Sequence, residues 1–258
     1  MTSVSISLVR ALVEQLERVG IAPSTLAERA GFTLLELADP TRRMDLPRYD
    51  RAQLAALELS CDPALGLHLG ERAPLAAFNM VGPLTAHCRT LRECIEVALR
   101  YYPLVADVAA PELETDGASV RVVYHYVRSE PVVNRLRAEF GLTRLLGIGR
   151  IFAGADALPE EVWFDHADPG YAEEHTRIFG CPVRFDMKVS AIVFARDLLD
   201  RAQHHGNPVL YRALVGEADR QLERLSEVRP VASRVLAVLP RLRCSVTTRK
   251  PGIGLSCG

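Results

Sequence analysis

The chain has 258 residues, of which 48% are hydrophobic and 24% are charged, and its 31 basic and 32 acidic residues nearly cancel. These fractions are ordinary for a globular protein and exclude a disordered, collagen-like or low-complexity chain, while the length allows one large domain or two small ones. No apolar run approaches the roughly 18 residues of a membrane span, and the amphipathic N-terminus lacks the pattern of a signal peptide.

The charges are unevenly distributed. The chain from residue 228 onward contains six basic residues and no acidic one, which leaves a net charge of −7 on the first 227 residues. An acidic body is a poor surface for nucleic acid, and a basic tail is a better one.

The cysteines are scattered, and no two of them have the Cys-x-x-Cys spacing of a redox or zinc motif. We therefore expect reduced thiols rather than a disulfide framework, which predicts a soluble cytoplasmic protein. The six are Cys61, Cys88, Cys94, Cys181, Cys244 and Cys257.

Residues 1–72 are predicted to form a helical N-terminal layer. Apolar residues from Leu8 to Val19 recur at helical spacing, with Ser7 as the N-cap and Gly20 as the residue that ends the helix. Two further helices are expected at 24–30 and 49–59.

Residues 73–228 are predicted to form an α+β unit. Thr90 and Glu93 have the spacing of a capping box, and Asp116-Gly117 is a hairpin signal between two β-rich runs. Glycines in the helix that follows Pro131 indicate close packing against a sheet. The expected elements are a helix from 90, strands at 105–114 and 120–127, a helix at 131–152, a strand at 161–165, a helix at 171–179, a strand at 190–194 and a helix at 207–228. The fold class is therefore expected to be α+β, with the helical layer followed by a mixed or antiparallel sheet packed with helices.

The last thirty residues do not continue this organisation. Residues 229–242 begin another helical pattern, which we interpret as the start of a linker helix. Residues 243–258 have neither a helical nor a strand period and are expected to form an irregular tail.

No catalytic or metal-binding constellation is recognised in the sequence. His166 and His175 are separated by eight residues, and none of the seven histidines has the HxxH or HExxH spacing that places two ligands on one helix face. The adjacent pair His204-His205 does not have this spacing either. P-loop, GxGxxG and GxSxG motifs are absent. We therefore expect no enzyme, no catalytic residue, no metal site and no cofactor.

A weak helix-turn-helix pattern is formed by Ala27, Gly31 and Leu37. Its reading helix would contain Glu36 and Asp39 and no arginine, so that it would present negative charge to the phosphates of DNA. Ordinary helical packing is the favoured interpretation, and no DNA-binding residue is assigned.

Amphipathic side chains in the predicted core could line an apolar pocket and orient a ligand through a few polar groups. The set consists of Tyr101, Tyr102, Tyr124, His125, Tyr126 and Trp163. We select Tyr101, His125 and Trp163 as candidate ligand-binding residues, and ordinary core packing remains the alternative for each of them.

A series of short segments carries a family resemblance by its order and spacing. The segments are residues 65–70 (LGLHLG), 82–84 (GPL), 90–93 (TLRE), 162–166 (VWFDH) followed by Pro169 and Tyr171, 179–185 (FGCPVRF), Leu198-Leu199 and Asn207-Pro208. Together they resemble the N-terminal effector-binding domain of AraC/XylS-type transcription regulators, in the subgroup described as arabinose-binding-like. The resemblance covers about residues 8–227.

This resemblance implies a cytoplasmic domain that senses a small-molecule effector and forms a homodimer, joined to a C-terminal DNA-binding part with two helix-turn-helix units. Residues 231–242 resemble the first helix that leads into the DNA-binding part, and the likeness ends after Leu242. We therefore expect this chain to lack the DNA-binding domain, so that it would contact DNA only through such a domain. Effector binding would shift the conformation of the regulator. Two alternatives stay open: an interaction module that forms mixed dimers with full-length relatives and, less favoured, a small-molecule enzyme.

Overall fold

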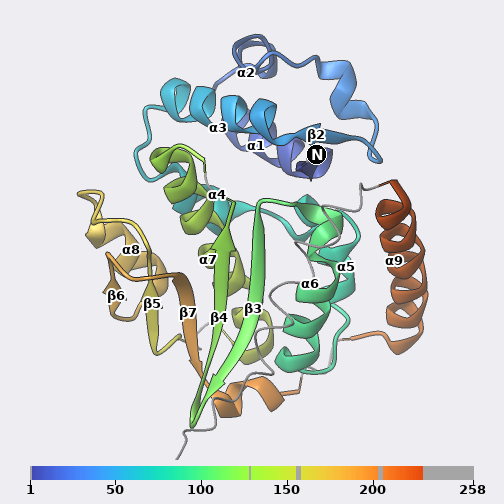
Figure 1. Ribbon diagram of the computed structural model, residues 1–258, viewed down its shortest axis with the longest axis vertical. Helices are drawn as coiled ribbons and strands as arrows, with labels where there is room; N and C mark the ends of the chain where they lie inside the picture. Colours follow the sequence, from blue (N-terminus) through green and yellow to red (C-terminus); the bar gives the residue numbers. More distant parts are fainter. Residues whose placement is uncertain (1, 128, 155–157, 203–205, 229–258) are drawn as a thin grey trace, which may run out of the picture.

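The structure is a computed structural model that describes residues 2–127, 129–154, 158–202 and 206–228 (Figure 1). The expected linker helix, the expected tail and the pair His204-His205 lie outside the described residues. No helix within the described ranges is long and apolar enough to cross a membrane.

The N-terminal helical layer forms one end of the molecule (Figure 1, blue). It contains α1 (Ile6–Arg18), α2 (Pro23–Ala30) and α3 (Leu46–Ser60), together with a small antiparallel ribbon of β1 (Ser3–Ser5) and β2 (Arg43–Asp45) that the sequence did not predict. Helix α1 begins two residues earlier than expected, because the side chain of Ser5 rather than Ser7 accepts the capping hydrogen bond, from the Ser7 amide at 3.3 Å.

The segment that resembled a DNA-reading helix is a single 3-10 turn, η1 (Leu34–Ala38). Its carboxylate Glu36 caps the turn and pairs with Arg48, which lowers the pKa of Glu36 to about 2 through hydrogen bonds and charge. The described structure therefore contains no second helix at this position for DNA readout.

Short helices follow and connect the layer to the sheet: α4 (Leu65–Arg72), η2 (Leu75–Phe78), α5 (Val81–Thr85) and α6 (Leu91–Val105). The Glu93 amide donates to the Thr90 hydroxyl, as the capping box predicted, but the Glu93 carboxylate accepts from the Arg89 amide instead of that of Thr90. Helix α6 continues to Val105, so the expected strand at 105–114 begins only at Ala109.

One mixed sheet has the strand order β3-β4-β7-β5-β6. The strands are β3 (Ala109–Asp116), β4 (Ser119–Tyr126), β7 (Ser190–Ala195), β5 (Glu161–Trp163) and β6 (Val183–Arg184). All neighbours are antiparallel except β5 and β6, and β6 was not predicted. The β3–β4 hairpin turns at Gly117, whose φ of +61° suits glycine. The α+β prediction is confirmed.

Helix α7 (Pro131–Ala153) lies at the centre of the molecule, and α8 (Ala172–Phe179), η3 (Arg196–Asp200) and α9 (Pro208–Val228) complete the fold. As its glycines predicted, α7 packs closely on the sheet: Gly141 lies beside Tyr126 of β4 and Gly149 beside Phe194 of β7. Helix α9 lies on the outside, along α5 and α6 (Figure 1, red).

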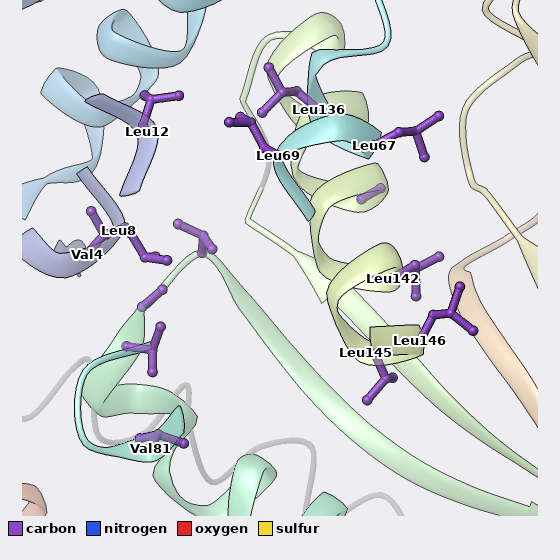
Figure 2. Packing of buried hydrophobic residues seen from close by; sticks show 14 of the residues in the cluster. Val4, Leu8, Leu12, Leu67, Leu69, Val81, Leu136, Leu142, Leu145 and Leu146 are labelled. Atoms are coloured by element: carbon purple, nitrogen blue, oxygen red, sulfur yellow. The ribbon is translucent and has the colours of Figure 1, made fainter. Parts of the chain in front are cut away.

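Helices α4 and α7 approach each other unusually closely. A Cβ atom on Gly66 would lie 2.6 Å from the carbonyl oxygen of Leu136, and one on Gly70 would lie 2.8 Å from that of Phe140. Figure 2 shows Leu67 and Leu69 of α4 beside Leu136 of α7 in the same core. The two glycines of the LGLHLG segment thus remove the side chains that would separate the helices.

Candidate functional site

A cavity of about 100 Å³ lies between the helical layer, the short helices, the sheet and α7. That volume is many times what a single buried water molecule needs. Its wall is mostly apolar, and it includes Leu8 of α1, Val81 of α5 and Leu145 of α7, which Figure 2 labels. The polar side chains in the wall are Tyr49, Gln53, Thr85, Tyr102, Tyr124, Tyr126, Arg137 and Arg144.

One stripe of α7 forms a wall of the cavity. Arg137, Phe140, Arg144 and Ile148 line it at spacings of three or four residues, which places them along one face of the helix. The stripe carries two arginines in a helix that is buried on several faces, and both guanidinium groups are nearly hidden from solvent, with Arg137 3% and Arg144 9% exposed.

Arg137 has partners inside the protein. Its Nε donates to Gln53 Oε1 at 3.1 Å and its Nη2 pairs with the Asp50 carboxylate, while its guanidinium lies 5.9 Å from the ring centre of Tyr49. Its Nη1 is buried and has no hydrogen-bond partner among the described residues. The charge of Arg137 is therefore paired, but one donor remains unused.

Arg144 differs, because no hydrogen bond or ion pair joins its guanidinium to another group in the described ranges. Its Nε is buried and unsatisfied, and its carbon lies 5.3 Å from the ring centre of Phe78. Burial lowers the pKa of Arg144. The nearby Cys94 supplies no negative charge, since its contact with Cys88 and its burial raise the pKa of the thiol well above the usual range. Arg144 thus holds a buried cation without an anion.

Three phenol groups complete the polar part of the cavity. No hydrogen bond joins the hydroxyls of Tyr49, Tyr102 or Tyr124 to another group in the part of the chain that the structure describes. Burial raises the pKa of Tyr49 and Tyr124 to about 12, so both phenols keep their protons at neutral pH and can donate. Tyr126 instead donates to the carbonyl of Arg137 at 3.2 Å and stacks on Tyr124.

An unpaired buried cation is costly for a folded protein, whereas it is an effective anchor for an anion that enters the same apolar space. The arrangement in this cavity can bind a small organic molecule through an apolar or aromatic body and one carboxylate. The phenols and Gln53 provide further hydrogen bonds that would fix its orientation.

None of the three candidate residues from the sequence lines this cavity. Tyr101 is buried on α6 but donates to Asp219 of α9 at 2.6 Å, and His125 is exposed on β4. Trp163 is half-buried on β5, donates to Glu161 at 2.7 Å and lies beneath the guanidinium of Arg121. Their role in effector binding stays a prediction, and the three residues do not meet around this cavity.

Three of the residues that line the cavity are immediate sequence neighbours of two of those candidates. Tyr124 and Tyr126 flank His125 and share the opposite face of β4, and Tyr102 follows Tyr101 on α6. Strand alternation was a signal for the first two, since residues i and i+2 share one face. For Arg137 and Arg144 the signal was their seven-residue spacing within an otherwise apolar stripe.

A second buried polar cluster lies on a different face of α7. Glu139, His166 and His175 each direct one potential metal-ligand atom toward a common point, with these atoms within 4.8 Å of one another. The sequence spacing gave no indication of this cluster, because its three residues come from α7, from the loop after β5 and from α8.

Comparisons with known proteins agree on one family. Residues 20–203 match the sequence family described as the arabinose-binding N-terminal domain of AraC transcription regulators. The chain is 24% identical over 241 residues to an ornithine utilization regulator of Pseudomonas aeruginosa, covering 93% of this chain and 69% of that protein. The crystal structure of the transcriptional regulator CdpR from Pseudomonas aeruginosa has a similar fold, with a TM-score of 0.59, 14% identity, and coverage of 89% of this chain and 70% of that one.

Proposed function

Because this chain belongs to the AraC family of transcription regulators through its arabinose-binding N-terminal domain, we propose that it is an effector sensor whose ligand is a small organic carboxylate. The observation that carries the proposal is the buried guanidinium of Arg144, which faces the cavity without an anionic partner in the described residues. The family name describes the group of domains, and this wall favours an acid with an apolar body over a neutral sugar.

The proposed binding mode follows from the cavity wall. The carboxylate of the ligand accepts hydrogen bonds from the guanidinium of Arg144, which lines the cavity. The body of the ligand packs against Phe78 and Ile148, and the hydroxyls of Tyr102 and Tyr124 select ligands with a further acceptor.

Ligand binding would act by a population shift. The cavity is bounded by α1 and α3 of the helical layer, by α6 and by α7, so an occupied cavity favours one arrangement of these elements over others. We propose that this shift is passed on to a separate DNA-binding domain, which is how the chain would regulate transcription.

A thermal-shift panel tests the proposal. Aliphatic and aromatic carboxylic acids are compared with their primary amides, which have the same shape without the charge. At least one acid is expected to raise the melting temperature of the wild type by several degrees, and its amide is not. Arg144→Met should abolish the shift, whereas Arg220→Met, which removes an exposed arginine of α9 paired with Glu217, should retain it.

Two results would overturn the proposal. One is a panel in which no acid stabilises the wild type. The other is a ligand that stabilises the wild type and Arg144→Met equally, because such a ligand does not use the buried cation.

We also propose that the chain forms a homodimer through α9. Its inner face is attached to α6, where Arg100 and Tyr101 contact Asp219, and its first turn leaves Val209 69% and Leu210 42% exposed. Light scattering after gel filtration should give a dimer mass for the wild type and a monomer mass for Leu210→Asp. A monomer at every concentration would reject this interface. Incubation with a full-length relative would test the alternative of mixed dimers in the same measurement.

A further inference from the structure

The side chains of Glu139, His166 and His175 converge beneath α8. Glu139 and His175 are 1% and 0% exposed, and His166 is partly exposed. Nε2 of His175 lies 3.3 Å from Oε1 of Glu139, which also accepts the hydroxyl of Tyr171 at 2.6 Å. Apolar rings surround the cluster, since Phe164 and Phe185 each contact both histidines.

The hydrogen bonds of the two imidazole rings fix which nitrogens carry protons. Nδ1 of His166 lies 2.8 Å from the carbonyl oxygen of Ala167, and Nδ1 of His175 lies 3.2 Å from that of Tyr171. A carbonyl oxygen can only accept, so both Nδ1 atoms are the donors, and each neutral ring presents a lone pair at Nε2.

Both Nε2 atoms are buried and have no hydrogen-bond partner among the described residues. They face the Glu139 carboxylate, which is another acceptor and which already accepts from Tyr171, so no donor lies between the carboxylate and the two Nε2 atoms. A proton on one ring would satisfy one Nε2 and leave the other unsatisfied, whereas a cation between them satisfies all three at once.

We propose that Glu139, His166 and His175 form a binding site for a divalent transition-metal ion, with Zn²⁺ as the ion that best fits two imidazoles and a carboxylate. Tetrahedral zinc places its ligand atoms about 3.4 Å apart, which matches the separation of His175 and Glu139. The ligand atom of His166 lies within 4.8 Å of the other two, so a small movement of its ring is enough to bring in the third ligand.

The surroundings are those of a metal-binding histidine pair. Ligand histidines usually donate their second ring nitrogen to a carbonyl or carboxylate, and an apolar shell limits access of water. Both features are present here. The ion would fasten the β5–β6–α8 region to α7, which is also the helix that carries Arg137 and Arg144.

Metal analysis of the whole chain tests this site without any ligand for the cavity. The protein is stripped with a chelator, reloaded with excess Zn²⁺ and desalted, and its zinc content is measured. The wild type is expected to retain about one ion per chain and to melt several degrees higher than the stripped protein. Substitution with Co²⁺ should give the visible spectrum of nitrogen and oxygen ligands without a thiolate charge-transfer band.

Variants of the proposed ligands and of other histidines distinguish this site from zinc bound elsewhere on the chain. His166→Gln, at the partly exposed position, and Glu139→Gln, which preserves shape, should each weaken zinc binding at least about tenfold. His125→Gln, at an exposed histidine on β4, and a double replacement of His204 and His205 by glutamine should retain it. If a variant fails to fold by circular dichroism, the cobalt spectrum of the wild type still decides the ligand type.

Three outcomes would overturn the site: no zinc retained by the wild type, zinc content unchanged in both His166→Gln and Glu139→Gln, or a cobalt spectrum dominated by thiolate ligands. None of them depends on whether the cavity binds a carboxylate.

Discussion

The two buried polar regions on α7 carry opposite charges, Arg144 on one face and Glu139 on another. On the cavity face, Arg144 holds a positive charge with no anion in the described residues. On another face Glu139, which accepts from Tyr171, lies beside two imidazole nitrogens that have no hydrogen-bond partner in the same ranges. Arg137, two residues before Glu139 on the same helix, shows how a buried charge is paired within the chain, because Asp50 and Gln53 bind it. In our two proposals each region is completed from outside the chain, Arg144 with an anion and the Glu139 cluster with a cation.

The largest expected effect comes from breaking the close approach that positions Glu139. In Gly66→Ala the new methyl group would lie 2.6 Å from the Leu136 carbonyl and 2.9 Å from Cβ of Glu139. We expect a loss of about 2–4 kcal/mol in the free energy of unfolding, measured with urea, and loss of zinc binding.

Gly216→Ala is the matched control for this substitution. Gly216 lies in α9, where an added Cβ would meet only Arg220 at 3.8 Å. Alanine favours a helix over glycine, so this variant should be as stable as the wild type or up to about 1 kcal/mol more stable. Equal effects of the two substitutions would show that α4 and α7 are not in close contact.

The next largest expected effect is an increase in the free energy of unfolding. Arg144→Met replaces an uncompensated buried cation with an apolar side chain of similar length, and we expect the ligand-free protein to gain about 1–3 kcal/mol of stability in urea unfolding. Arg220→Met should change stability by less than about 0.5 kcal/mol, because its pair with Glu217 is exposed. A marked loss of stability in Arg144→Met would mean that the charge is already compensated in the free protein.

A smaller effect on ligand affinity distinguishes the contribution of the Arg144 charge from that of a hydroxyl hydrogen bond inside the cavity. Tyr124→Phe removes one hydroxyl from the wall and leaves the ring stacked on Tyr126. For an acid that stabilises the wild type, calorimetric titration should show affinity reduced about two- to tenfold, far less than in Arg144→Met. A loss as large as that of Arg144→Met would make the hydroxyl, rather than the charge, the main anchor.

The smallest expected effect concerns His68, a histidine whose two ring nitrogens both have carboxylate partners within the chain. Nδ1 of His68 lies 2.6 Å from Asp62 and Nε2 lies 2.8 Å from Glu174, which Arg177 also contacts. Burial alone would lower the pKa of His68, but the bonds with the two carboxylates outweigh it and raise the pKa above its usual value of 6.5. Since the folded pKa is raised, this stabilisation is complete below about pH 6.5 and is lost as the pH rises through the folded pKa.

The wild type should therefore exceed His68→Gln in stability at about pH 5.5 by less than about 1 kcal/mol, and the difference should shrink by about pH 8.5. Urea unfolding at the two values measures it, with His125→Gln as the exposed control. A difference that grows with pH would contradict a protonated His68.

Periodicity and capping predicted most of the fold, because they are local properties of the chain. The helices at α1, α2, α3, α7, α8 and α9 and the β3–β4 hairpin were expected within a few residues of their bounds. The ribbon β1–β2 and the strand β6 were missed, since two or three residues carry no period and form only by pairing with distant segments.

The candidate site was harder to predict, because its chemistry depends on which face of each element is turned inward. Tyr124 and His125 are equally plausible in a strand, and only packing decided that the tyrosine faces the cavity. The spacing of Arg144 from Arg137 places it on the same helix face, but it does not show that Arg144 lacks an anionic partner among residues far away in the sequence. The same holds for Glu139, which meets its histidines only through the packing of α8.

The position of a bound acid tests the central claim most directly. A crystal structure of the chain with a brominated form of the most stabilising acid would locate the bromine by its anomalous signal and the carboxylate by its density. The account predicts the carboxylate within about 3 Å of the Arg144 guanidinium, with the ring or alkyl body beside Phe78 and Ile148. An acid bound outside the cavity, for example beside Tyr101, His125 or Trp163, would contradict it.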